Sequence, residues 1–123
     1  MSAEDLATQF VSHYYTTVDS GNWQGLASLY QPQSILTFEG TKIEGGAQNI
    51  IQKWSSIGRL VHNIGAFRKD IQQTPGGSMI LLVTGQLVVD SNPPLNFTQV
   101  FHLVPFGAGQ FYIHNEMFRL SLA

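Results

Sequence analysis

The chain has 123 residues, of which 43% are hydrophobic and 11% aromatic, and this excludes an intrinsically disordered protein. Only 11% of the residues are charged, and six basic against eight acidic side chains give a formal net charge of −2. This balance excludes nucleic-acid binding, which depends on clustered Lys and Arg. The absence of cysteine excludes disulfides and thiolate metal ligands. We expect one domain spanning residues 1–123.

The first half of the chain predicts helices around a short hairpin. The first helix begins after the capping residue Ser2 and ends at Gly21, and its apolar residues recur every four positions: Leu6, Phe10, Tyr14 and Val18. A second helix is expected from Asn22 through Tyr30, and Pro32 prevents its continuation. Residues 34–38 and 41–44 predict two short strands, and helical spacing returns from Ala47 to about Gly58.

The second half predicts antiparallel sheet. Four extended segments are separated by turns rich in Gly and Pro: residues 60–74, 79–89, 95–104 and 110–120. Helices at one end of the chain and strands at the other indicate an α+β fold with the helices on one face of the sheet.

The strands are apolar on both faces. Met79 and Leu81 share one face, while Ile80 and Leu82 on the opposite face are also apolar. Because the helices cover only one side of a bent sheet, we expect the other side to pack against a second copy in a two-fold dimer. The longest apolar run, Met79 to Val83, is far shorter than the ~20 residues of a membrane span, so no membrane insertion is expected.

Six segments in this order resemble the nuclear transport factor 2 family and together cover nearly the whole chain. They are Phe10–Tyr15, Leu26–Tyr30, Ser34–Gly40, Gly85–Leu87, Phe97–Leu103 and Phe111–Leu120. The resemblance implies a cone of helices on a strongly bent, mostly antiparallel sheet that forms a homodimer through the sheet. It also implies a carrier without catalysis, cofactor or metal. Such a carrier takes the GDP form of the small GTPase Ran from the cytoplasm into the nucleus and touches phenylalanine-glycine repeats of nuclear-pore proteins.

The resemblance also implies roles for individual residues. Acidic groups that pair with Ran lysines fall on a rim at Glu39 and Asp90, with Asn92 at the third rim position. Five residues would line the cavity that receives an aromatic side chain of Ran: Phe38, Leu60, Leu95, Val100 and Phe118. Three would belong to the dimer face: Phe101, Met117 and Arg119.

Three features depart from the family pattern. Asn92 stands where the family pattern has a further acid two positions after the rim Asp, so one charged contact is lost. The N-terminal Trp that takes part in repeat binding aligns near Ala3. The usual Leu-Pro-Phe stretch after the third helix is replaced by Ser56–Arg59 in a segment about two residues shorter. The first departure concerns the Ran-binding rim, and the second concerns repeat binding.

Two alternatives remain open within the same fold. The first is the small subunit of an mRNA-export heterodimer or a peptide-binding interaction domain. The second is an enzyme resembling ketosteroid isomerase, because Tyr14 falls at the position of its oxyanion-stabilising Tyr and Glu39 within one residue of its base. The acidic second oxyanion donor of that enzyme is replaced by apolar residues near Val100. The four histidines, His13, His62, His102 and His114, lack the tight spacing of a zinc site, so no metal is expected.

Overall fold

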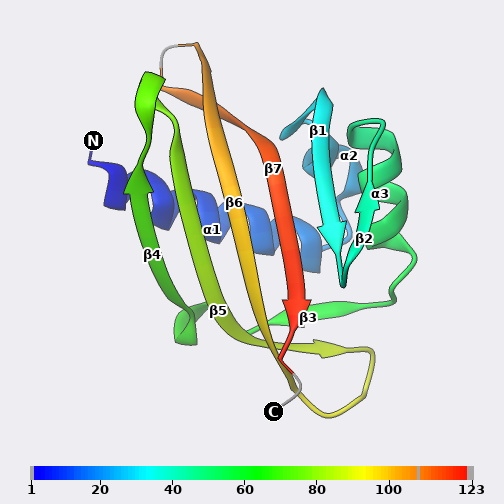
Figure 1. Ribbon diagram of the computed structural model, residues 1–123. Coiled ribbons are helices and arrows are strands. Elements are labelled where there is room, and N and C mark those ends of the chain that lie inside the picture. The colour runs from blue at the N-terminus through cyan, green and yellow to red at the C-terminus, as the bar shows by residue number, and fades with distance from the viewer. Residues whose placement is uncertain (1, 108, 122–123) are drawn as a thin grey trace.

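A curved sheet of seven strands with three helices against one face makes up the protein in the computed structural model, which describes residues 2–107 and 109–121 (Figure 1). The predicted turn at residues 105–109 therefore includes one position, Ala108, outside the described residues. The helices are α1 (Ala3–Asp19), α2 (Trp23–Ala27) and α3 (Ala47–Ser55), with short 3-10 turns η1 (Ile64–Ala66) and η2 (Pro75–Gly77). The strands are β1 (Tyr30–Phe38), β2 (Thr41–Ile43), β3 (Leu60–His62), β4 (Arg68–Gln73), β5 (Met79–Val89), β6 (Leu95–Gly107) and β7 (Gln110–Leu120).

The strands follow the order β2-β1-β7-β6-β5-β3, and β4 also pairs with β5. All pairs are antiparallel except β1 with β7, which run parallel. The expected α+β class, with helices on one face of a curved and mostly antiparallel sheet, is confirmed.

Helix α1 crosses behind the long strands (Figure 1). Its N-cap is Ser2, whose Oγ accepts a hydrogen bond from the backbone N–H of Asp5 at 3.1 Å, and this satisfies one of the otherwise unpaired first-turn donors. The buried face of α1 packs on alternate residues of the strands. In β6 these are Phe97, Gln99, Phe101 and Leu103, all at most 2% exposed.

The opposite face of the sheet carries the intervening residues, and none of the helices in the described ranges lies on it. It includes two exposed apolar side chains, Ile80 at 42% and Met117 at 52% exposure, together with half-buried Leu82 and Val100. Val100 pairs in register with Leu82 on β5 and with Met117 on β7, so these apolar residues form one continuous patch. We call this the outer face.

Two predicted elements are wrong in their bounds. Tyr30 begins strand β1 rather than ending a helix, because it pairs with Ile113 of β7 and the N–H of Ile113 donates to Leu29 O at 2.8 Å. Pro32 lies within β1, at the register shift between Tyr30 and Ile35, where no ladder hydrogen bond is needed from it.

The segment 60–74 is two strands rather than one. Strand β3 pairs with the far end of β5, where Leu60 faces Val89, and β4 pairs with the near end, where Gln73 faces Met79. The 3-10 turn η1 separates them. Phe67 lies so close to Gly85 of β5 that a Cβ on Gly85 would overlap the Phe67 ring. Because Gly85 has no Cβ, Phe67 can pack against β5 where the chain turns between β3 and β4.

Candidate functional site

An apolar pocket opens where α3 meets the ends of several strands. It has a volume of about 40 Å³. Every residue that lines it is apolar: Phe38, Trp54, Ile57, Leu60, Leu87, Val89, Leu95, Phe118 and Leu120. Four of the five residues that were expected to line the cavity therefore lie around this one pocket: Phe38, Leu60, Leu95 and Phe118.

Three aromatic rings form one wall of the pocket. The rings of Phe38 and Phe118 are stacked at a centroid distance of 5.0 Å, because these residues face each other in the parallel pair β1–β7. Trp54 of α3 meets both rings edge-on, at 5.4 and 5.5 Å. Such contacts contribute about 0.5–1.5 kcal/mol per pair beyond the burial of area, so this wall is held in place before any ligand arrives.

Glu39 and Asp90 stand at the edge of this pocket, directly after the lining residues Phe38 and Val89. Glu39 donates its N–H to Phe118 O at 3.0 Å and accepts the Leu120 N–H on Oε1 at 2.5 Å. Asp90 donates its N–H to Arg59 O at 2.7 Å and accepts the Arg59 N–H on Oδ1 at 2.9 Å. Each acid therefore ties its turn to a neighbouring segment by a pair of hydrogen bonds.

The two acids share an uncommon backbone conformation. Their φ angles are +50° for Glu39 and +54° for Asp90, and they are the two non-glycine residues with positive φ in the described parts of the chain. This region is sparsely populated by residues with a Cβ, and the paired hydrogen bonds stabilise it. Gly58 lies against the Asp90 carboxylate, where an added Cβ would stand 2.8 Å from Oδ2.

The third rim residue, Asn92, is exposed and neutral. Its Nδ2 donates to Val89 O at 2.9 Å, so the amide closes the β5–β6 turn. The rim as the sequence analysis defined it thus carries two carboxylates.

Two expected positions are wrong, and they are neighbours. Val100 does not line the pocket, because it lies on the outer face. Phe101 does not belong to the outer face, because its side chain is fully buried and meets the rings of Phe10 and Tyr14 of α1 at centroid distances of 5.0 and 4.8 Å. Met117 and Arg119, by contrast, are both exposed on the outer face.

A buried polar cluster centred on Glu116 was missed by the sequence analysis. The carboxylate accepts hydrogen bonds from the hydroxyls of Tyr14 and Tyr30 at 2.5 and 2.6 Å and from Nε2 of Gln99 at 2.5 Å. Glu116 is 1% exposed, and burial raises its pKa to about 7, although its three hydrogen-bond donors oppose the rise. Alternation along β7 from buried Phe118 would have placed Glu116 on the inner face.

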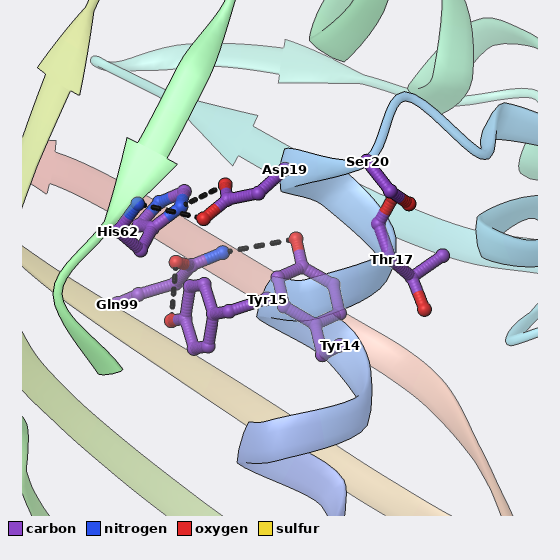
Figure 2. A network of polar contacts seen from close by, with 7 residues as sticks. All are labelled: Tyr14, Tyr15, Thr17, Asp19, Ser20, His62 and Gln99. Atoms are coloured by element: carbon purple, nitrogen blue, oxygen red, sulfur yellow. Dashed lines mark hydrogen bonds and ion pairs between the residues drawn. The ribbon is translucent and has the colours of Figure 1, made fainter. Parts of the chain in front are cut away.

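The cluster extends to the end of α1 (Figure 2). Tyr15 donates its hydroxyl to Oε1 of Gln99 at 2.6 Å. Nearby, the carboxylate of Asp19 accepts the backbone N–H of His62 at 2.7 Å and contacts its Nδ1 at 2.6 Å, which ties α1 to β3. Burial also raises the pKa values of Tyr14 and Tyr15 well above the usual value, so their hydroxyls stay protonated and act as donors.

The geometry does not assemble the isomerase site considered above. The hydroxyl of Tyr14 is engaged with Glu116 inside the core, and Tyr14 does not line the apolar pocket. Glu39 is bound to the end of β7 at the pocket edge. Within residues 2–107 and 109–121 no three His, Cys, Asp or Glu side chains gather in a metal-binding group. No helix in the same ranges is long and apolar enough to cross a membrane.

Comparison with known proteins identifies relatives over almost the full chain. The model of the nuclear transport factor 2 domain matches residues 6–120. Nuclear transport factor 2 of Neurospora crassa is 44% identical over 95% of this chain and 94% of that protein. Nuclear transport factor 2B of Arabidopsis thaliana is 41% identical over 100% of this chain and 98% of that protein. The structure of nuclear transport factor 2 from Cryptosporidium parvum superimposes with a TM-score of 0.85 at 40% identity, covering 96% of this chain and 94% of that one.

Proposed function

The chain belongs to the nuclear transport factor 2 family, and from that premise we propose that it is a nuclear import carrier without catalytic activity. In this proposal its single domain binds the GDP form of Ran and phenylalanine-glycine repeats of pore proteins. It works as a homodimer that moves between cytoplasm and nucleus through the pore.

The observation that carries the proposal is an aromatic-walled pocket with carboxylates at its edge. The volume of about 40 Å³ is smaller than an aromatic ring, so in this proposal one aromatic side chain of a partner enters as the aliphatic lining side chains move apart, and burying such a side chain is worth about 1.5–3 kcal/mol. The wall formed by Phe38, Trp54 and Phe118 offers ring faces and edges to an incoming ring.

The carboxylates supply orientation and speed of encounter. Glu39 and Asp90 each use one oxygen for a backbone N–H, and among the described residues no hydrogen bond engages the other oxygen. The second oxygen of each can therefore receive a lysine ammonium of the partner. Charges at an interface edge raise the association rate more than they add affinity. Because Asn92 is neutral, this chain offers two such charges where the family pattern has three.

The outer face supports the homodimer. Ile80 and Met117 are exposed there, and Leu82 and Val100 join them into one apolar patch on the sheet side opposite the described helices. A two-fold axis through this patch would place the same residues of two copies against each other.

A role without catalysis agrees with the chemistry of the pocket. None of its lining residues is titratable, so the pocket contains no general acid, base or nucleophile. Glu116 has a raised pKa, but it lies in the core behind three hydrogen-bond donors and does not line the pocket.

Isothermal titration calorimetry with Ran loaded with GDP, and separately with a GTP analogue, tests the proposal. We expect binding that is selective for the GDP form and that Glu39→Lys weakens by at least a few-fold, because it sets a positive charge against lysines. The matched control is Glu44→Lys, the same charge change at a 65% exposed side chain of the segment after β2, which should bind normally. Equal binding of both nucleotide forms, or equal loss in both variants, would contradict the proposed site.

A further inference from the structure

A bulge in the β6–β7 pair brings two histidines and an asparagine together on the outer face. His102 of β6 faces Asn115 of β7, but the next pair is Leu103 with Ile113, so His114 is an extra residue on β7. Ile113 and Glu116 on either side of His114 and Asn115 are both 1% exposed and point into the core. The two residues between them are half-buried and must both point away from the core.

The side chains in this bulge converge on one point. Nδ2 of Asn115 lies 3.1 Å from Nδ1 of His102 and 2.7 Å from Nδ1 of His114. Both imidazole Nδ1 atoms therefore lie within hydrogen-bond distance of one atom of the same side-chain amide, and they face the same small volume. The ring centroids are 5.4 Å apart.

Imidazole nitrogens are usual ligands of borderline transition-metal ions, and here two of them face one small volume. We propose that His102 and His114 bind one divalent transition-metal ion, such as Zn²⁺, Ni²⁺ or Cu²⁺, with the side-chain oxygen of Asn115 as a further ligand. Rotation of the Asn115 amide by half a turn directs its carbonyl oxygen toward the two Nδ1 atoms, and an ion between these three atoms would replace the close contacts that the –NH₂ group makes.

In the single chain none of the described helices lies on the outer face, and both rings are half-buried, so water can complete the coordination of an ion. In the proposed homodimer this face packs against a second copy, which would then complete or close the site. The spacing of His102 and His114 in the sequence does not reveal the site, because the bulge rather than a short motif brings them together.

Titration calorimetry of the untagged full chain with ZnCl₂ and NiCl₂, in a buffer that does not chelate metals, tests the proposal. We expect His102→Gln and His114→Gln each to weaken binding by roughly tenfold or more, since each removes one of two nitrogen ligands. Asn115→Asp should strengthen binding several-fold because a carboxylate oxygen is a better ligand than an amide oxygen. Thermal melts followed by circular dichroism show that each variant folds.

Two controls separate this site from unspecific binding. His13→Gln removes an exposed histidine on α1, on the other side of the sheet, and should leave the affinity unchanged. MgCl₂ should give no binding, because Mg²⁺ prefers oxygen ligands. A stoichiometry of one ion per chain, or one ion shared by two chains across the outer face, supports the site as long as the His102 and His114 variants lose it.

The proposal is overturned if Zn²⁺ and Ni²⁺ bind no more tightly than about 1 mM. It is also overturned if folded His102→Gln and His114→Gln variants bind as well as the unaltered chain, or if His13→Gln loses as much affinity as they do. None of these results depends on Ran, so the metal site and the carrier function stand or fall separately.

Discussion

The carboxyl group of Glu116 should make the stability of the protein fall as the pH rises through neutrality. In the native state, burial raises its pKa from 4.5 to about 7. The unfolded chain has the ordinary value, so the native state holds this proton more tightly. The contribution of Glu116 to stability is therefore fully present below about pH 4.5 and is lost as the pH rises through about 7.

The size of the effect follows from the same two pKa values. At 1.36 kcal/mol per pKa unit, the rise from 4.5 to about 7 corresponds to a loss of roughly 3 kcal/mol of unfolding free energy between pH 4.5 and pH 8. This is a large part of the roughly 5–15 kcal/mol of unfolding free energy that is typical of a folded domain. The variant Glu116→Gln cannot ionise. Because Gln keeps one oxygen acceptor for the tyrosine hydroxyls, we expect its stability to change much less over this range.

Urea unfolding at a series of pH values, at one fixed protein concentration and followed by tryptophan fluorescence, measures this difference. Trp54 is 2% exposed and reports on loss of the core. Subtracting the curve of Glu116→Gln from that of the unaltered chain removes the contributions of the histidines and surface carboxylates, which both proteins share. Glu44→Gln, at an exposed side chain, is the control and should follow the unaltered chain.

Two results would refute this reasoning. If the curves of the unaltered chain and Glu116→Gln run parallel from pH 5 to pH 8, Glu116 does not titrate in that range. If instead the difference grows in favour of the unaltered chain with rising pH, the hydrogen bonds from Tyr14, Tyr30 and Gln99 outweigh burial, and the native carboxyl group is ionised throughout.

Two further substitutions test the outer face and the rim. Met117→Lys replaces a 52% exposed side chain, so we expect the single chain to fold while sedimentation equilibrium shows a monomer; a retained dimer would place the interface elsewhere. Gly58→Ala should lower the unfolding free energy by about 1–3 kcal/mol in thermal melts, since Gly58 has φ +121° and the added Cβ would stand 2.8 Å from Oδ2 of Asp90. An unchanged melting temperature would mean that the rim adapts freely to the added Cβ.

The sequence predicted most of the architecture because periodicity and turn residues are local signals. The repeat of Leu6, Phe10, Tyr14 and Val18 gave α1, and Gly and Pro clusters marked the ends of the long strands. The division of 60–74 into β3 and β4 depends on Phe67 packing over Gly85, which lies 18 residues away in the chain. No local pattern contains that contact.

Val100 and Phe101 were each expected on the wrong face of β6, and this error has a related cause. A shift of one residue moves a strand position to the other face, and both side chains are apolar, so polarity does not decide between the faces. Gln99 adds to the ambiguity, because a polar residue in an alternating strand normally indicates solvent. Here it is 1% exposed, and it faces the core because Glu116, Tyr14 and Tyr15 supply its hydrogen-bond partners.

The rim carboxylates have two roles that Glu39→Lys cannot separate, and Glu39→Gln can. Gln retains an oxygen that accepts the Leu120 N–H, so the turn that holds φ +50° stays bonded, while the charge is removed. We expect an unfolding free energy within about 0.5 kcal/mol of the unaltered chain. If the charge steers a basic partner, the association rate constant for Ran-GDP in stopped-flow experiments should fall a few-fold at low salt, and the two proteins should converge as salt screens the charge. A rate constant that stays equal at low salt would assign Glu39 to the structure of the turn alone, and the choice of partner would then rest on the aromatic pocket and Asp90.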